Sequence, residues 1–411
     1  MRKIISGNVL VAQGGGPTAV INQSLAGVVV ESRKFPQIGH VYGALQGVQG
    51  IVNEKLIDLT ETTEHNLEAV AQTPGAALLS TRDKPDKEYC GKILKVLWKH
   101  CVRYFFYIGG NDSAETCLII KKQAAKARHK LRVVHIPKTI DNDLLVTDHC
   151  PGYGSAARFV ALAFAGANLD NQALPGVYIG VVMGRDAGFL TAASCLARTY
   201  PDDGPHLIYL PERTFDEARF VADVKTVLAR HKRCVVAVAE GIKDAKGNRI
   251  GADWEHVDKF GNPLLSGALV AKRLTDALER DKSIERIRAD VFGYLQRSLP
   301  GCVSEVDRFE AREVAEKAVQ YAIRHDLDGS VAIRRIGDYA VEYALKSLES
   351  VAKKTRHMED EYIAASGTDV TEAFRAYVKP LAGPLPCIER IAAPAVPSKP
   401  QGRRAGGMRV R

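Results

Sequence analysis

Short apolar runs alternate with amphipathic stretches along most of the chain. Residues 8–13, 102–108, 131–136, 176–182 and 234–239 are apolar runs with the length of a buried strand. Longer segments between them carry apolar residues three and four positions apart, which predicts helices. A regular alternation of strand and helix is typical of mostly parallel sheets covered by helices on both faces. We therefore predict an α/β protein.

Further segments extend this pattern. Other predicted strands are 38–45, 206–210 and 286–293, and residues 330–335 and 339–345 alternate in the manner of a hairpin. The predicted helices are 19–33, 63–72, 89–100, 152–171, 186–199, 215–231, 263–279 and 304–324, the last with Ser304 as its cap, and one more runs on from the 109–113 motif to about 127. We expect a surface loop over 246–261 and irregular structure over 362–391.

Length and charge refine this prediction. A chain of 411 residues exceeds the limit of about 250–300 for one core, so we expect two lobes. Five of the nine net positive charges belong to residues 391–411, a segment rich in Pro, Gly and Ala that we expect to be disordered. The remaining +4 does not favour nucleic acid as a partner and fits clusters of Arg and Lys that bind phosphates.

Several protein classes are excluded by the sequence. No apolar run of about 18 residues is present, so we expect no membrane span. The Met1 end has no apolar segment of the kind found in signal peptides. The eight cysteines are scattered without a Cys-x-x-Cys pair, which favours buried thiols in a reducing cytoplasm over a zinc site or disulfides.

Candidate chemistry follows the ends of three predicted strands. Residues 14–18 and 109–113 are glycine turns that precede helices, an arrangement that can bind anions, although tight packing also favours glycine. Residues 137–143 follow the third strand and contain a lysine, a threonine and two aspartates. Because active sites of open α/β sheets lie at the carboxyl ends of strands, these three segments are expected to meet.

With these motifs in view, the chain resembles the phosphofructokinase family, and more specifically its pyrophosphate-dependent branch, from about Val9 to about Leu385. Six motifs in order carry the resemblance: Gly-Gly-Gly-Pro-Thr (14–18), Gly-Gly-Asn-Asp-Ser (109–113), Pro-Lys-Thr-Ile-Asp-Asn-Asp (137–143), Met-Gly-Arg (183–185), Ala-Glu-Gly (239–241) and Gly-Tyr-Leu-Gln-Arg (293–297). The resemblance implies two Rossmann-like lobes with mostly parallel sheets and an active site in the cleft between them.

The resemblance also implies a division of the chain. Residues 1–150, with about 296–345 returning, would form the phosphoryl-donor lobe. Residues 151–295, with part of 346–390, would form the sugar-phosphate lobe. The basic segment 391–411 would lie outside both lobes.

The resemblance assigns roles to single residues. Asp141 would take the proton from the 1-hydroxyl of fructose 6-phosphate, because an alcohol is a poor nucleophile until a base accepts its proton. Thr139 would contact that hydroxyl or the transferring phosphoryl group, and Arg185 would stabilise charge in the transition state. The implied donor-binding residues are Gly15, Arg82, Asp112, Ser113 and Lys138. The implied sugar-phosphate residues are Thr139, Asp143, Met183, Gly184, Arg185, Glu240, Arg288, Tyr294 and Arg297.

Two positions indicate which phosphoryl donor the chain uses. ATP-dependent relatives usually have glycine where this chain has Asp112 and Lys138. An aspartate would fill the space of a nucleotide's α-phosphate and repel its charge, and a lysine suits the remaining phosphates. Both residues therefore favour pyrophosphate. An ATP-dependent enzyme and a non-catalytic regulatory subunit remain the alternatives, and the second is disfavoured because Asp141 and Arg185 are present.

The expected cofactor is Mg²⁺, and the expected partners are copies of the same chain. Asp112 and Asp143 are the candidate magnesium ligands, and Asn111 stands where this branch often has an acid. In this family some phosphate-binding residues reach a neighbour's site. We therefore expect a homodimer or homotetramer in which Arg288 or Arg297 crosses between subunits.

Overall fold

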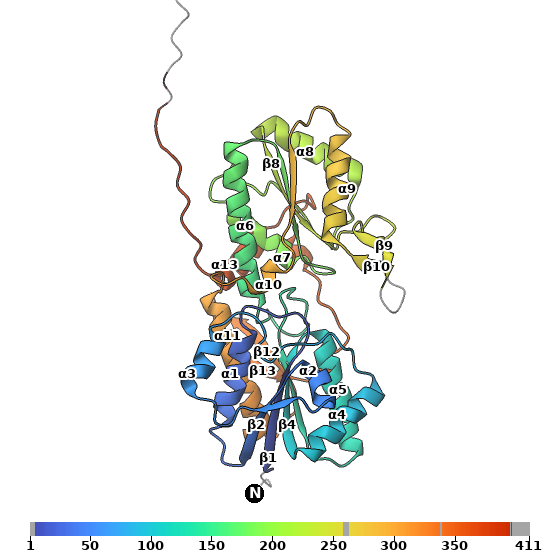
Figure 1. The fold of residues 1–411 in the computed structure, drawn as a ribbon. Coiled ribbons are helices and arrows are strands. Elements are labelled where there is room, and N and C mark those ends of the chain that lie inside the picture. Colours follow the sequence, from blue (N-terminus) through green and yellow to red (C-terminus); the bar gives the residue numbers. More distant parts are fainter. Residues whose placement is uncertain (1–4, 258–262, 338, 395, 397–411) are drawn as a thin grey trace, which may run out of the picture.

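The structure is a computed structural model that describes residues 5–257, 263–337, 339–394 and 396, and its chain forms two lobes, one above the other in Figure 1. Within these residues the lower lobe contains a seven-stranded sheet in the order β13-β12-β5-β4-β1-β2-β3. Its strands are β1 (Gly7–Gln13), β2 (Ile38–Ala44), β3 (Leu56–Asp58), β4 (Val102–Gly109), β5 (Arg132–Pro137), β12 (Gly329–Ile336) and β13 (Ala340–Lys346).

Both faces of this sheet are covered by helices. Because side chains of a strand alternate between the faces, Val9 and Val11 of β1 join one buried cluster, and Leu10 and Ala12 join another. The first cluster includes residues of α1 (Ile21–Ser32), α3 (Glu64–Ala71) and α11 (Glu305–Val319). The second includes residues of α2 (Gly47–Val52), α4 (Lys87–Lys99) and α5 (Asn111–Lys126).

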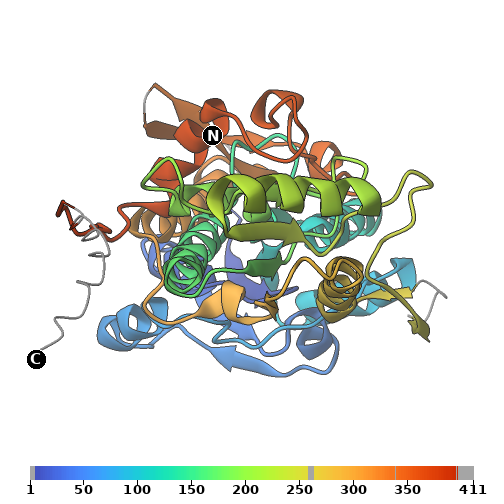
Figure 2. The same ribbon diagram turned by 90° about the horizontal axis from the view of Figure 1, so that it is seen from above.

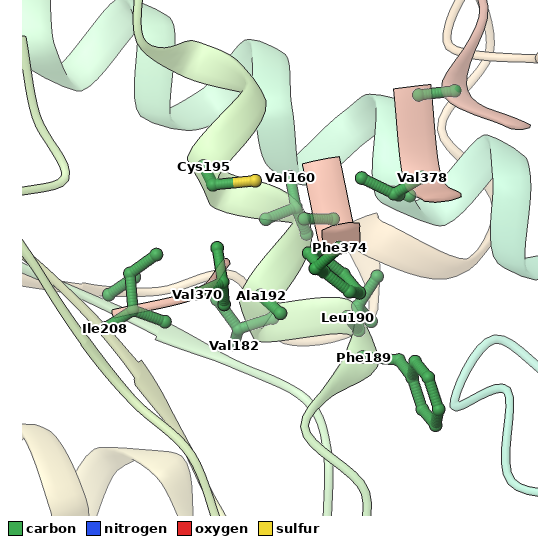
Figure 3. Close-up of a cluster of buried hydrophobic side chains, with 14 of the residues drawn as sticks. Val160, Val182, Phe189, Leu190, Ala192, Cys195, Ile208, Val370, Phe374 and Val378 are labelled. Carbon is green, nitrogen blue, oxygen red and sulfur yellow. The ribbon is translucent and has the colours of Figure 1, made fainter. Parts of the chain in front are cut away.

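The upper lobe is built on a parallel sheet in the order β11-β6-β8-β7. Its strands are β6 (Val177–Val182), β7 (Leu207–Tyr209), β8 (Cys234–Ala239) and β11 (Ile287–Val291). On one face pack α6 (Tyr153–Ala173), α7 (Phe189–Ala192) and α13 (Glu372–Ala382), whose apolar side chains interlock in Figure 3. The other face carries α8 (Glu217–His231) and α9 (Gly267–Glu279). Seen from above, α6 and α9 are nearly end-on and α8 lies across the view (Figure 2).

The remaining elements are short. They are α10 (Leu295–Ser298), α12 (Leu348–Val351), the antiparallel pair β9 (Ala252–Val257) and β10 (Pro263–Leu265), and the single turns η1 (Ala193–Ala197), η2 (Gln320–Arg324) and η3 (Asp360–Tyr362).

The predicted α/β class with mostly parallel sheets is confirmed, and so is the hairpin, which is the antiparallel pair of β12 and β13. The cysteines of the described residues form no disulfide, and five of them are buried. No helix in the part of the chain that the structure describes is long and apolar enough to cross a membrane.

Two helix predictions were wrong at their starts. Residues 186–199 form only the short α7 followed by the 3-10 turn η1. The helix predicted from Pro263 begins at Gly267, because Ser266 accepts a hydrogen bond from Leu269 N–H and caps it. Residues 263–265 instead pair with β9, so the loop predicted over 246–261 is partly a strand.

Two predictions near the chain's end were also wrong. Residues 362–391 are not all irregular, since they contain α13, which is capped by Thr371 and buries Phe374 and Tyr377. Ser304 precedes α11, but its hydroxyl donates to Leu381 O at 2.6 Å and does not cap the helix. Of the predicted tail 391–411, residues 395 and 397–411 lie outside the described residues.

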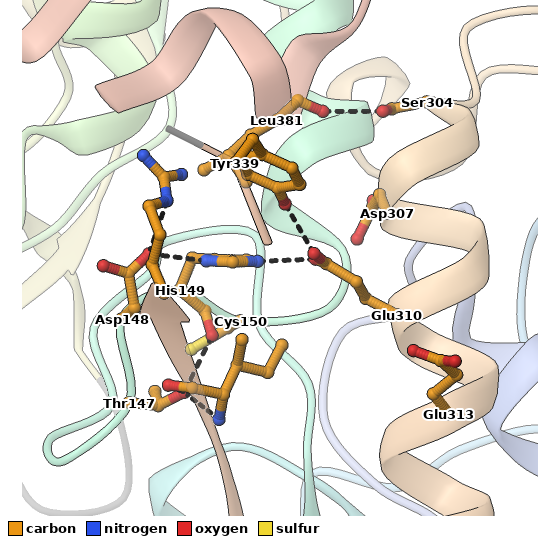
Figure 4. Close-up of polar contacts among 12 residues, drawn as sticks. Thr147, Asp148, His149, Cys150, Ser304, Asp307, Glu310, Glu313, Tyr339 and Leu381 are labelled. Atoms are coloured by element: carbon orange, nitrogen blue, oxygen red, sulfur yellow. Dashed lines mark hydrogen bonds and ion pairs between the residues drawn. The ribbon is translucent and has the colours of Figure 1, made fainter. Parts of the chain in front are cut away.

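A buried polar network joins the segment between β5 and α6 to the lower lobe (Figure 4). His149 contacts Asp148 through Nδ1 at 2.7 Å and Glu310 of α11 through Nε2. Glu310 also accepts a hydrogen bond from the Tyr339 hydroxyl. Although burial disfavours a charged imidazole, its hydrogen bonds to Asp148 and Glu310 raise the pKa of His149 to about 9. The network therefore holds a charged histidine between two carboxylates.

The two sheets present their carboxyl ends to one another. β1, β4 and β5 end at Gln13, Gly109 and Pro137, and the segments after them run toward the upper lobe. β6 and β8 end at Val182 and Ala239, toward the lower lobe (Figure 1). All six sequence motifs therefore lie between the lobes.

Candidate active site

Three strand ends of the lower lobe are tied together by backbone hydrogen bonds. The Gly14 N–H donates to Ile108 O at 2.9 Å, and the Lys138 N–H donates to Gly109 O at 3.0 Å. Gly15, whose φ is 77°, donates to Thr81 O at 3.0 Å. The positive φ explains the glycine here, because other residues adopt it at a cost. The two glycine turns and the 137–143 segment thus form one surface, as the sequence predicts.

The turn with the two aspartates is held by its own side chains. The Asp141 N–H donates to Thr139 Oγ1 at 3.1 Å, and the Thr139 hydroxyl is hydrogen-bonded to the Asp143 carboxylate. Between the acids, Asn142 is fully buried and has a φ of 58°. Asn111 Nδ2 lies 3.4 Å from Asp143 Oδ2. The two carboxyl groups are therefore fixed close to the second glycine turn.

Burial dominates the electrostatics of these acids. It raises the pKa of Asp141 well above the usual range for an aspartate, and the neighbouring charges of Asp143 and Glu240 add to the increase. Burial also raises the pKa of Asp143, whereas its hydrogen bond from Thr139 acts in the opposite direction. A carboxylate with a raised pKa binds a proton more strongly, which suits a general base near neutral pH.

A buried lysine and a half-buried arginine lie beside the acids. Lys138 is 4% exposed, and its Nζ donates to Gly16 O at 2.8 Å. Burial, followed by the charge of Arg297, lowers the pKa of Lys138 to about 8. A Cβ atom built on Gly16 would lie 3.1 Å from Arg297 Cζ, so this arginine reaches from the end of the upper sheet to the first glycine turn. An anion between the lobes would meet both cations.

The upper lobe contributes a second set of loops. The Met183 N–H donates to Gln296 Oε1 at 3.1 Å, which links two of the motifs. The Gly241 N–H donates to Gly184 O at 3.1 Å. Burial raises the pKa of Glu240, whereas a backbone hydrogen bond from Gly184 lowers it. The predicted residues Met183, Gly184 and Glu240 are therefore brought together, and the charge of Glu240 reaches Asp141.

Three predicted phosphate or transition-state residues point to solvent. Arg185 is exposed at the start of its loop. Tyr294 is 74% exposed, and Arg297 Cζ lies 4.6 Å from its ring centroid. Arg288 is exposed on the edge strand β11, where its side chain donates to Ile287 O at 2.8 Å. The structure thus brings Arg297 to the acids but leaves Arg288 apart from them.

The predicted donor residues occupy different positions. Ser113 is buried against Gly109 and hydrogen-bonded to the Tyr107 hydroxyl. Asp112 lies in the first turn of α5 and forms an exposed ion pair with Lys84 at 3.1 Å. Arg82 is also exposed, and its positive charge acts on Lys138 and on Arg297.

The oxygen atoms around Asp143 and Asn111 bear on whether the site can hold a magnesium ion. The described residues include no group of three or more His, Cys, Asp or Glu that could hold a metal. Asn111 Oδ1, however, is buried without a hydrogen-bond partner, and it belongs to the residue that approaches Asp143. Mg²⁺ commonly takes one or two protein oxygens together with water and phosphate oxygens. The residues present fit a site of that kind.

A protein-family model described as phosphofructokinase matches residues 8–322. The chain belongs to the phosphofructokinase family. It is 60% identical over 384 residues to the pyrophosphate--fructose 6-phosphate 1-phosphotransferase of Rhodospirillum rubrum, covering 92% of this chain and 95% of the relative. The enzyme of the same name from Xanthomonas campestris is 39% identical over 387 residues, covering 92% and 91%.

Among solved structures, a pyrophosphate-dependent phosphofructokinase from Marinobacter aquaeolei superposes with a TM-score of 0.83. That protein is 32% identical, and the match covers 93% of this chain and 94% of the other. The fold predicted from the sequence resemblance is therefore confirmed, and so is membership of the phosphofructokinase family.

In this phosphofructokinase chain, some residues near the motifs were not singled out from the sequence. Asp186 is paired with Lys243 at 3.1 Å and with Arg249 at 2.7 Å, and it directly follows Arg185. Gln296 lies inside a recognised motif but was given no role. Arg249 lies in the segment predicted as a surface loop and Lys243 lies just before it, so only their proximity to Glu240-Gly241 in the sequence could have indicated them.

Proposed function

We propose that this chain reversibly transfers a phosphoryl group from pyrophosphate to the 1-hydroxyl of fructose 6-phosphate, giving fructose 1,6-bisphosphate and phosphate. The observation that carries the proposal is the half-buried Asp141 carboxyl group, flanked by Lys138 and Arg297 between the two sheets. A base next to fixed cations suits transfer of an anionic group to an alcohol. The names of relatives that are 60% and 39% identical support the same activity.

The proposed chemistry divides among the chain's own residues. Asp141 accepts the proton of the 1-hydroxyl as its oxygen attacks phosphorus, and Thr139 orients that hydroxyl. The bond from phosphorus to the bridging oxygen breaks, and the leaving phosphate remains at the first glycine turn. Arg185 moves from its exposed position to the transferring group, where it stabilises the charge on the equatorial oxygens.

Binding of the two substrates is assigned mainly to opposite lobes, with Asp143 and Arg297 of the donor lobe also facing the sugar phosphate. We propose that the donor lobe is 1–150 with 296–345, and that the sugar-phosphate lobe is 151–295 with part of 346–390. Gly15, Lys138, Ser113 and Arg82 bind pyrophosphate through backbone N–H groups and cations. The residues proposed for the sugar phosphate are Asp143, Met183, Gly184, Glu240, Arg288, Tyr294 and Arg297.

We propose Mg²⁺ as the cofactor. Asp143 and the unpartnered Asn111 Oδ1 would hold it. Asp112 would also bind the ion after its ion pair with Lys84 breaks. When bound, the ion neutralises charge on the phosphate oxygens.

The choice of pyrophosphate over ATP rests on Lys138 and Asp112. Lys138 fills the space beside Gly15, since a Cβ atom there would lie 3.1 Å from Lys138 Nζ. Asp112 and Lys84 form an ion pair at the N-terminus of α5. The glycine of ATP-dependent relatives at this position would leave room for the α-phosphate of a nucleotide. The alternative of a non-catalytic subunit is disfavoured by the presence of Asp141 and Arg185.

We propose that the enzyme is a cytoplasmic homodimer or homotetramer. The exposed position of Arg288 on an edge strand supports a role in a neighbouring subunit's site. Arg297 is already directed into its own subunit's site, so Arg288 is the better candidate for crossing between subunits.

A donor comparison tests the function. The purified chain is assayed with fructose 6-phosphate and Mg²⁺, with either pyrophosphate or ATP, and formation of the bisphosphate is followed. We expect kcat/KM to be at least about 100-fold higher with pyrophosphate, because single steric and charge conflicts are worth about 3 kcal/mol. Equal or faster turnover with ATP would overturn the donor assignment, and no turnover with either donor would overturn the activity.

A further inference from the structure

The turn that carries Asp141 and Asp143 depends on the residue between them. Asn142 has a φ of 58°, a left-handed conformation that side chains other than glycine adopt only when their surroundings hold them there. It is also fully buried, so its amide needs hydrogen-bond partners inside the protein. Its Oδ1 accepts from the Cys150 N–H at 3.0 Å, and its Nδ2 donates to the Tyr377 hydroxyl at 2.7 Å.

Tyr377 lies far away in the sequence, on α13, yet its hydroxyl joins both ends of the loop. It accepts from Asn142 near the acids and donates to Asp148 O at 2.9 Å near the loop's end. Burial raises the pKa of Tyr377, so this hydroxyl keeps its proton at every working pH. One oxygen atom thus bridges the start and the end of the segment 142–148.

The ring that carries this hydroxyl is itself held on several sides. Its centroid lies 5.3 Å from that of Tyr362 in a stacked arrangement, and Arg335 Cζ lies 4.9 Å from it. Arg335 Nη2 also donates to the Tyr377 carbonyl at 3.0 Å, and Phe374 packs beside the ring. A hydroxyl on so restrained a ring can fix the position of Asn142.

We propose that Tyr377 is a positioning residue for the Asp141–Asp143 pair, because its hydroxyl holds the Asn142 amide and the Asp148 carbonyl and so sets the turn that presents both carboxyl groups. This inference rests on the proposed function, in which Asp141 is the base. It places part of the catalytic geometry on the last helix of the described chain. Displacements of about 1 Å at a catalytic group can cost about 100-fold in rate, so the loss of one hydroxyl is measurable.

The test is the Tyr377→Phe variant, which removes the hydroxyl and leaves the ring among its neighbours. We expect kcat to fall about 10- to 100-fold while KM for fructose 6-phosphate changes less than about 2-fold, since the turn moves and the binding loops of the upper lobe do not. Tyr362→Phe is the matched control. Its ring belongs to the same cluster, and within the described residues its hydroxyl makes no hydrogen bond to the loop, so its kcat should equal that of the wild type.

A double-mutant cycle separates positioning from general support of the core. Asn142→Gly retains the left-handed backbone but removes both amide hydrogen bonds. If Tyr377 acts mainly through Asn142, adding Tyr377→Phe to Asn142→Gly lowers kcat far less than Tyr377→Phe does alone, and only by the loss of the remaining hydrogen bond to Asp148 O. Additive losses, or a Tyr377→Phe enzyme with kcat within 2-fold of the wild type, would overturn the proposal.

Hydrogen exchange gives a readout that does not require turnover. We expect faster exchange of the backbone amides of residues 141–150 in Tyr377→Phe and not in Tyr362→Phe. If the wild-type chain shows no activity, the proposed function fails, but this measurement still tests whether Tyr377 holds the 141–150 segment in place. Unchanged exchange of these amides would overturn the positioning role by itself.

Discussion

Asp141 is largely removed from solvent and is still surrounded by charged groups, two properties that seldom occur together. Burial and the nearby carboxyl groups of Asp143 and Glu240 raise its pKa, whereas Arg297 and Lys138 oppose this. Neutral surroundings alone would keep the group protonated and useless as a base. The cations allow it to ionise near neutrality, where a base of raised pKa accepts protons efficiently.

Replacing Asp141 by Asn tests this role directly. We expect kcat to fall about 10²- to 10⁴-fold, the usual contribution of a general base. Binding of fructose 6-phosphate, measured by calorimetry, should stay within a few-fold of the wild type, because the amide is similar in shape to the carboxylate. Turnover within a few-fold of the wild type would show that another group takes the proton.

Residues that belong to a motif at a strand end could be assigned from the sequence, whereas ion pairs between surface side chains of separate segments could not. Lys138, Thr139 and Asp143 are found as one motif at a strand end, and the structure keeps them together. The ion pair of Asp112 with Lys84 could not be predicted, because no local pattern indicates which surface lysine approaches the start of a helix.

At the scale of elements, the loop after β6 is shaped by the turn after β8. A Cβ atom on Gly241 would lie 2.0 Å from the carbonyl oxygen of Arg185 and 2.6 Å from that of Gly184. Backbone atoms cannot rotate aside as side chains can. The close approach of the two loops therefore depends on glycine at this position.

We predict that Gly241→Ala moves the 183–185 loop and lowers kcat about 100-fold, because Arg185 loses its alignment. Gly166→Ala on α6 is the control. A Cβ atom there meets nothing within 4 Å, and alanine should stabilise the helix by about 0.5–1 kcal/mol without loss of activity. Equal kcat values for Gly241→Ala and the wild type would contradict the role given to this contact.

Strands and long helices were predicted well because their patterns extend over many residues. β1, β4, β5, β6 and β8 all lie where the apolar runs indicate. The prediction failed where the period is too short to recognise, as in α7, or where proline obscures a helix. α13 contains Pro380 within its last turns, yet its apolar face buries Phe374 and Tyr377. Packing against the upper lobe determines this helix more than its local sequence does.

At the scale of the whole molecule, the charged His149 links the segment between the lobes to α11. Its pKa in the folded protein is about 9, above the ordinary value of 6.5. The contribution of protonated His149 to the free energy of unfolding is therefore fully present below about pH 6.5 and is lost as the pH rises through about 9.

We predict that His149→Gln lowers the free energy of unfolding by about 3 kcal/mol at pH 6, because the buried Glu310 carboxylate loses its cation and the half-buried Asp148 loses one of its positively charged neighbours. The difference from the wild type should shrink as the pH rises to 10, as measured by urea unfolding. His40→Gln, at an exposed ion pair with Asp58, should give a small difference over the same range. A difference for His149→Gln that does not change with pH would show that His149 is neutral in the folded protein.

The discontinuous sheet of the lower lobe also has a consequence for how the chain is made. β1 to β5 leave the ribosome before residue 140, but β12 and the helix α11, which covers α1, come after residue 300. Until then the apolar cluster that contains Val9, Val11 and Leu25 lacks the residues of α11 and β12 that complete it. During synthesis the apolar residues of the incomplete lower lobe therefore stay partly exposed, and prone to aggregation, while the upper lobe is translated. The nascent chain is therefore expected to need chaperone protection until its last third emerges.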